Sequence, residues 1–172
     1  METPEESAAL TRKIMRISKL NAWSVTIIAG TFTFLSLLGL SLAGITVGLA
    51  VTIAGPIEMR GHRKLANHEP DAQRWMVGSQ VWLMACVLAY CGWRLMSLDP
   101  DNPFAVFGDA AQVFALVEAM GLPMEQLRTL FVQAFTITYA LIAGLTVLFQ
   151  GGLALYYRSR IERVTVLNKH SD

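Results

Sequence analysis

The residues best suited to chemistry lie in one basic stretch near the middle of the chain. Glu58 and His62 are four residues apart, a spacing at which two side chains meet on one helical turn. Together with His68 and nearby carboxylates they suggest a metal site. However, the stretch has no tight ligand spacing, and its arginines would repel a cation. We therefore interpret these side chains as solvated loop residues and expect no bound metal.

The remaining reactive groups form no catalytic pattern. Cys86 and Cys91 would point about 140° apart on a helix, so they cannot easily pair or share a metal. No nucleophile has a base at usable spacing, and the glycines of the apolar runs are not placed as in a phosphate-binding loop. All 3 histidines lie outside the apolar runs, where a haem would need its axial ligand. The sequence predicts neither an enzyme nor a cofactor.

The composition is typical of a membrane protein. Of the 172 residues, 53% are hydrophobic and 16% are charged, whereas soluble domains carry roughly 25% charged residues. The mean hydropathy is +0.44. A net charge of +1 argues against nucleic-acid binding through a basic surface. The predicted partner is therefore the lipid bilayer, and nucleic acid is excluded.

The first apolar run determines the predicted topology. It extends from Leu20 to Ile57 without a charge. As one helix of about 38 residues it would be about 57 Å long, nearly twice the hydrocarbon core of about 30 Å. Gly39 and Gly44 flank its middle, and glycine readily adopts turn conformations. We predict an all-α integral membrane protein with four transmembrane helices, the first two forming a tight hairpin.

Eight segments follow from this reading. They are a basic amphipathic segment (1–19), span 1 (20–39), span 2 (40–58), a basic inner loop (59–74), span 3 (75–96), an acidic outer loop (97–122), span 4 (123–158) and a basic tail (159–172). The apolar face of the first segment is expected to lie on the inner leaflet. An interfacial helix over residues 104–120 is expected in the outer loop.

The basic residues favour four spans over three. Of the 14 basic residues, 11 fall in the first segment, the inner loop and the tail, and Arg158 ends span 4 on the same side, so four spans place 12 on one side. Short cytoplasmic loops are enriched in Lys and Arg, so both termini are predicted to be cytoplasmic. The architecture resembles many small four-span bacterial membrane proteins, which suggests the bacterial inner membrane, but no motif names a family. Ser41-Leu42-Ala43 loosely resembles a signal-peptide cleavage site, yet apolar sequence continues directly after it.

Small and polar residues mark where helices could meet. Gly44 and Gly48 form a small-residue motif in span 2. Span 4 carries a stripe at three-and-four spacing, made of Thr129, Gln133, Thr136, Ala140, Gly144, Val147 and Gly151. Packing within the chain and a pore-lining or subunit-facing stripe are both open readings. A different group, Arg60, Arg63, Lys64 and Arg74, is predicted to contact anionic lipid.

Two functions remain open. One is a small multi-pass membrane protein that acts through protein or lipid contacts as an accessory subunit of a membrane complex. The other is a homo-oligomeric channel or carrier with span 4 lining the pathway. Glu58 and Arg94 are expected at span ends, where their side chains reach water, so no ionisable residue is expected at mid-depth.

Overall fold

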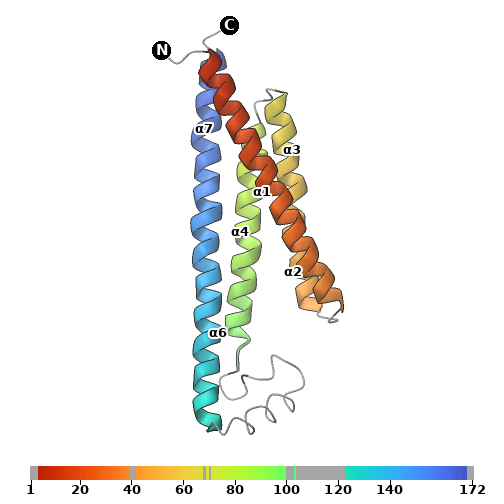
Figure 1. Ribbon diagram of the computed structural model, residues 1–172, viewed down its shortest axis with the longest axis vertical. Coiled ribbons are helices and arrows are strands. Elements are labelled where there is room, and N and C mark those ends of the chain that lie inside the picture. The colour runs from red at the N-terminus through yellow and green to blue at the C-terminus, as the bar shows by residue number, and fades with distance from the viewer. Residues whose placement is uncertain are drawn as a thin grey trace. The chain divides into compact units, whose positions relative to one another are not determined.

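The computed structural model describes residues 4–38, 42–67, 69, 71–99, 103 and 123–169, and these ranges contain helices and no strand. The elements are α1 (Pro4–Leu38), α2 (Leu42–Thr52), α3 (Ala54–Ala66), α4 (Ala72–Met96), α6 (Met124–Thr146), the π-helical η2 (Val147–Gly151) and α7 (Gly152–Lys169). Figure 1 shows the helices that these ranges form, coloured from the N-terminus to the C-terminus. The fold class predicted from the sequence is thus confirmed as all-helical within these ranges.

Four helical stretches are long and apolar enough to cross a membrane. They cover Ala8–Leu38, Leu42–Ala66, Ala72–Met96 and Met124–Glu162. Their number and order are those predicted from the three apolar runs. The expected turn near residue 40 and the expected interfacial helix over 104–120 lie outside the described residues.

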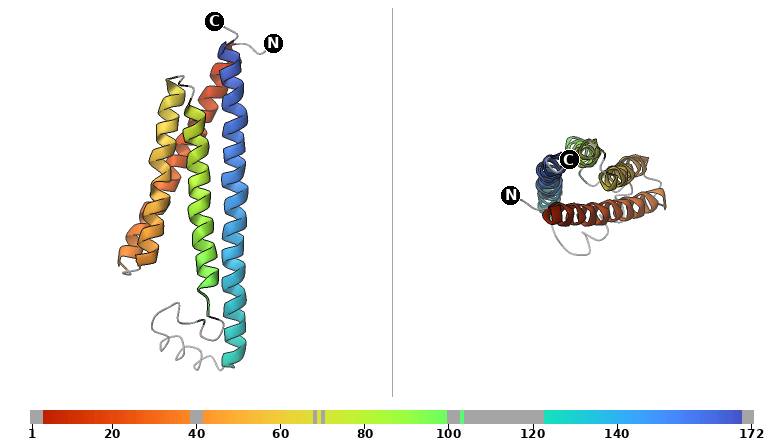
Figure 2. Two further views of the ribbon diagram at one scale, coloured as in Figure 1. Left: turned by 180° about the vertical axis from the view of Figure 1, so that it is seen from behind. Right: turned by 90° about the horizontal axis from the view of Figure 1, so that it is seen from above.

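The chain divides into two compact units. Unit 1 comprises Met1–Val87 with Thr146–Asp172, and unit 2 comprises Leu88–Leu145. Unit 1 therefore holds α1, α2, α3, most of α4, and α7. Figure 2 shows from a second direction that the first turns of α1 lie beside the last turns of α7. Unit 2 holds the end of α4 and nearly all of α6.

In unit 1, α1 runs antiparallel to α2 and α3. A Cβ added at Gly48 would collide with Thr33, and one added at Gly55 would collide with Thr26. Both threonine hydroxyls donate to carbonyls four residues earlier in α1, at 2.7 Å and 2.8 Å. Because these hydroxyls are already satisfied, the glycine backbones can approach them closely.

Proline explains the break between α2 and α3. Pro56 has no N–H to donate to the carbonyl four residues earlier, and its ring crowds that carbonyl. The irregular residue between the helices is Ile53, whose N–H bonds Leu49 O at 3.2 Å. Trp82 of α4 donates its indole N–H to Ala50 O at 2.9 Å, which ties α4 to this region.

The apolar core of unit 1 lies beside the first third of α1 and the middle of α7. Its buried members come from four helices: Ile14, Leu65, Ala72, Met76, Tyr157 and Ile161. The N-terminal segment is thus continuous with span 1, and its apolar face covers protein. This differs from the expected helix on the inner leaflet, because α7 and α3 supply an apolar surface for Ile14 to cover.

Besides its apolar core, unit 1 has two features that are unusual in a soluble protein. Large apolar side chains face outward, with Ile28 70%, Leu42 80% and Phe149 71% exposed. Ser18, Glu58, Ser79 and Gln80 are buried. In water such an apolar surface would favour association with other surfaces, whereas in lipid it needs no cover.

Unit 2 is organised around Arg94 in the last turn of α4. Its guanidinium lies 5.4 Å from the Phe135 ring centre and 5.9 Å from that of Tyr139. Arg94 Nε also donates to Tyr139 Oη at 3.2 Å. Tyr90 packs edge-on against Tyr139, with ring centres 6.1 Å apart. The Arg94 charge is therefore held by aromatic rings of α6. This differs from the sequence-based expectation, in which the side chain simply extends into solvent.

Candidate functional site

A buried carboxylate is the most unusual group in the described part of the chain. Glu58 of α3 is 2% exposed. Its Oε1 accepts a hydrogen bond from Tyr157 Oη of α7 at 2.6 Å, and its Oε2 accepts one from Asn21 Nδ2 of α1 at 2.6 Å. Both carboxylate oxygens are thus paired with neutral donors from other helices.

Two further polar side chains surround Glu58. Ser18 of α1 and Gln80 of α4 are 0% and 1% exposed, and both face the carboxylate. Gln80 Nε2 donates to Ser79 Oγ at 3.2 Å, and Ser79 Oγ donates to Met76 O at 2.8 Å. Within the described ranges, Ser18 Oγ and Gln80 Oε1 find no partner of good geometry. We call Ser18, Asn21, Glu58, Gln80 and Tyr157 the Glu58 cluster.

The buried faces of the helices explain how the Glu58 cluster assembles. In α3 the buried residues include Ala54, Glu58, Gly61 and Leu65, which repeat every three or four positions. Glu58 therefore occupies a core position. One helical turn from the cluster, toward the C-terminal end of α3, lies the apolar layer of Ile14, Leu65, Met76 and Ile161. This layer separates the carboxylate from that end of unit 1.

Glu58 differs from its sequence-based interpretation. The sequence placed it at the end of span 2, with access to water. Instead, the helix continues to Ala66. It can do so because Arg60, Arg63 and Lys64 lie on the sides of α3 that face away from the core. Eight further residues place Glu58 about 12 Å before the helix end. An ionisable group at such a position marks a candidate functional site by default.

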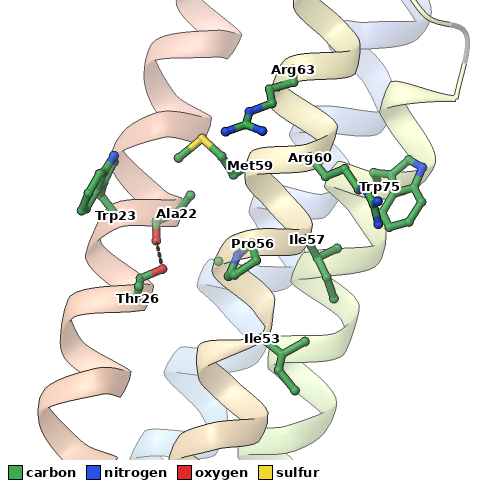
Figure 3. A pocket seen from close by; sticks show the side chains of 11 residues that line it. Ala22, Trp23, Thr26, Ile53, Pro56, Ile57, Met59, Arg60, Arg63 and Trp75 are labelled. Atoms are coloured by element: carbon green, nitrogen blue, oxygen red, sulfur yellow. Dashed lines mark hydrogen bonds between the residues drawn. The ribbon is translucent and has the colours of Figure 1, made fainter.

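An open groove of about 580 Å³ lies on the surface where α1 meets α3, close to this cluster. Arg60 and Arg63 line one end of it, and Ile53 and Pro56 line the other. Figure 3 shows Arg63 reaching from α3 toward α1, while Arg60 lies over Trp75 of α4. The Arg60 guanidinium is 5.1 Å from the centre of the Trp75 ring. We call this the α1/α3 groove.

The other two residues predicted to contact lipid lie elsewhere. Lys64 pairs with Glu69 and, at 3.0 Å, with Asp71. This partner holds the pKa of the Asp71 carboxyl below its usual value, chiefly through the hydrogen bond from Lys64. Arg74 lines a separate groove of about 430 Å³ with Trp82. The four basic residues thus separate into a pair at the α1/α3 groove, an ion-paired lysine and one arginine at a second groove.

The residues predicted to mark helix contacts also fall into two groups, one buried and one exposed. Gly44 and Gly48 are buried, and Gly48 lies against Thr33 of α1. In the span 4 stripe, Thr129, Gln133, Thr136 and Gly144 are exposed on α6, and Thr129 Oγ bonds Glu125 O at 3.0 Å. Gly151 lies in η2, where the π-helical turn interrupts the α-helical spacing of the stripe. A Cβ at Gly144 or Gly151 would meet nothing within 4 Å.

A third groove of about 420 Å³ lies beside the Glu58 cluster, between α1 and the η2–α7 region. Asn21 lines it and also donates to Glu58, so one side chain joins the groove to the carboxylate. Gln150 and Tyr156 line it as well, and their Oε1 and Oη are buried without a partner in the described part of the chain. Segments of π-helix are often found at functional sites.

No metal-binding group of three or more His, Cys, Asp or Glu side chains occurs among the described residues. His62 does not join Glu58, although the two are one turn apart. Its ring faces the Met15 backbone, with Lys19 and Arg63 nearby. Cys86 and Cys91 are separate free thiols. The arrangement can therefore hold a proton on Glu58 or pair it with an uncharged donor, but it offers no nucleophile–base pair.

No known protein family, curated protein or solved structure matches this chain.

Proposed function

We propose that the chain is a small multi-pass membrane protein that acts through contacts within the bilayer, as an accessory subunit of a membrane complex. The observation that carries this proposal is that unit 1 exposes many large apolar side chains while it buries a cluster of polar ones. Lipid or the apolar surface of another membrane protein matches such an exterior. In this proposal the Glu58 cluster fixes how four helices pack.

The proposed topology has two finer features. Spans 1 and 2 form a tight hairpin, which the antiparallel contacts of Thr33 with Gly48 and Thr26 with Gly55 support. An interfacial helix follows span 3 in the outer loop. Both termini face the cytoplasm of a bacterial cell, because the basic residues gather in the segments that four spans place on one side.

Two measurements test this proposal. Membranes carrying the chain are washed with alkaline carbonate, and reporters are fused in turn to each terminus. The chain should stay with the membrane, and both reporters should be active only on the cytoplasmic side. Release by carbonate, or termini on opposite faces, would refute the four-span membrane protein.

The contact role has its own test, centred on α6. A photo-crosslinking residue replaces Thr136, which is exposed one turn from the likewise exposed Gln133 on a helix that lipid would surround. An amide in hydrocarbon lacks partners, so a protein neighbour that hydrogen-bonds Gln133 is favoured. A protein adduct of defined mass is expected there, and Leu130 (59% exposed) serves as the matched position on the same helix. Lipid adducts alone at both positions would count against an accessory subunit.

The Glu58 cluster supports a second candidate, a channel or carrier with span 4 lining the pathway. The specific observation is that Asn21 joins the buried carboxylate to the groove lined by Gln150 and Tyr156. Proton- or cation-coupled carriers commonly use such an intramembrane carboxylate. In liposomes, Glu58→Gln should abolish ion-driven flux, and Glu162→Gln, an exposed carboxylate on α7, should leave it unchanged. Absence of flux in the unmodified chain would reject this candidate.

A further inference from the structure

We propose that the α1/α3 groove binds one anionic phospholipid of the leaflet next to the C-terminal end of α3, with its headgroup at Arg60 and Arg63 and an acyl chain along Ile53 and Pro56. This inference deepens the proposed function, since it rests on a chain that lies in a bilayer. It names a ligand class and selects two of the four basic residues predicted to contact lipid.

The groove changes from apolar to cationic along its length, and a phospholipid changes in a matching way from acyl chain to anionic headgroup. The lining residues run from Ile53, just before α3, through Pro56 and Ile57 to Arg60 and Arg63 on α3. Ten residues separate Ile53 from Arg63, which is about 15 Å along a helix. This is half of a hydrocarbon core of about 30 Å, hence the depth of one leaflet. The groove is apolar over that depth and cationic at its end.

The positive charges of Arg60 and Arg63 at the cationic end favour binding of an anion. Neither Arg60 nor Arg63 has a carboxylate partner among the described residues, whereas Lys64 nearby is already paired with two. Among the described residues that line the groove, none is acidic. Lys19 and Arg63 both lie near His62. Arginine binds phosphate oxygens with a planar fork of donors, and basic residues at the surface attract anionic headgroups.

The aromatic residues lie where the headgroup region would be. Trp23 of α1 and Trp75 of α4 line the groove near the arginines, and Trp23 is 54% exposed. Tryptophan is enriched at membrane–water interfaces. Figure 3 shows Trp23 and Trp75 on opposite sides of the groove, with Pro56 and Ile53 farther from the arginines. A free phosphate would use only the arginines, whereas a lipid explains the apolar part as well.

The test measures lipid binding by native mass spectrometry of the full chain in mild detergent. The probes are phosphatidylglycerol, which is anionic, and phosphatidylcholine, which has no net charge. The unmodified chain should retain one phosphatidylglycerol in preference to phosphatidylcholine. Arg60→Gln with Arg63→Gln should weaken that binding about 25-fold, from about fivefold for each basic residue near the membrane surface.

Two further variants separate the site from a general charge effect. Arg12→Gln with Arg16→Gln removes the same charge from exposed positions of α1 and should leave binding unchanged. Ile53→Trp fills the apolar part and keeps both arginines, so it should also weaken binding. Equal binding by all variants, or an equal loss in the Arg12/Arg16 variant, would overturn the groove as the site. Competition by millimolar inorganic phosphate would overturn the lipid as its ligand.

The outcome is separable from that of the proposed function. A chain that resists carbonate extraction and has both termini on one side, but shows no preference for phosphatidylglycerol, contradicts the groove alone. A chain that carbonate releases contradicts the membrane protein itself.

Discussion

The phenol of Tyr157 donates a 2.6 Å hydrogen bond to the carboxylate of Glu58, across a sequence separation of 99 positions. Both side chains are almost fully buried, at 0% and 2% exposure. This single contact links α3 to the last helix of the chain, and it gives the first prediction.

Removing the Tyr157 hydroxyl should destabilise unit 1. We expect Tyr157→Phe to lower the free energy of unfolding in mild detergent by about 1 kcal/mol, within the range measured for hydrogen bonds in proteins and in membrane helices. In a Glu58→Leu background the same substitution should cost clearly less, because its partner is gone. Tyr156→Phe is the matched control, since Tyr156 Oη has no partner in the described part of the chain. An equal loss of unfolding free energy in Tyr157→Phe and Tyr156→Phe would contradict a specific hydrogen bond between Tyr157 and Glu58.

The contact of α3 with α4 depends on a missing side chain at Gly61. A Cβ there would lie 2.6 Å from Met76 Cγ and 2.9 Å from the Met76 backbone nitrogen. The backbone cannot move aside as a flexible side chain does, so Gly61→Ala should destabilise the chain by about 1–3 kcal/mol.

Gly78→Ala on α4 is the control for Gly61. Its added methyl would meet nothing within 4 Å. Alanine is favoured over glycine inside helices by about 1 kcal/mol, so this variant should be neutral or slightly more stable. Thermal unfolding of both variants in detergent compares them directly. A stable Gly61→Ala would show that α3 and α4 do not approach as closely as described.

The connection between α3 and α4 should respond to acid. Lys64 holds the pKa of Asp71 below its usual value, so the folded state favours the ionised carboxylate. A group with a depressed pKa contributes stability above its unfolded pKa and loses it as pH falls through the folded value. Stability from this pair should therefore be complete at neutral pH and disappear at a pH below the usual range for aspartate.

Carboxyl titration by NMR measures this effect. In Lys64→Met, the Asp71 midpoint should rise toward its usual value. Because Asp71 is close to solvent, the change in overall stability should be small. An unchanged Asp71 midpoint would exclude the lysine as the cause.

Arginine should not be replaceable by lysine at position 94. The Arg94 guanidinium lies over two rings and bonds Tyr139 Oη, which a compact ammonium cannot reproduce together. We expect Arg94→Lys to lower stability by about 1 kcal/mol. Arg12→Lys, at an exposed position of α1, should have no measurable effect. Identical unfolding of the two variants would remove Arg94 as the organiser of unit 2.

The sequence predicted the number and order of the long helices because apolar length alone determines them. It did not reveal that α3 continues to Ala66. The charges of Arg60 and Arg63 ended the apolar run, although they lie outside the core while Gly61 and Leu65 continue the buried face. The spacing of Ala54, Glu58, Gly61 and Leu65 is a signal that could have placed Glu58 inside.

The partners of Glu58 were beyond sequence reasoning. Asn21, Gln80 and Tyr157 lie on three different helices, and nothing in their local sequence specifies which helices adjoin. Helix neighbours in a bundle are determined by packing over the whole unit. The close pair of Arg60 and Arg63 was visible, but the groove between α1 and α3 exists only after those helices pack.

The order of the Glu58 partners along the chain has a consequence for biosynthesis. Asn21 precedes the carboxylate, whereas Tyr157 emerges 99 residues after it. At roughly 5–20 residues per second, a ribosome needs about 5–20 s to make that stretch. During this interval the Glu58 carboxylate of the nascent α3 lacks the hydrogen bond that Tyr157 will later donate. A chain truncated before the final helix would keep that deficit permanently, which gives quality-control proteases a chemical mark of an unfinished product.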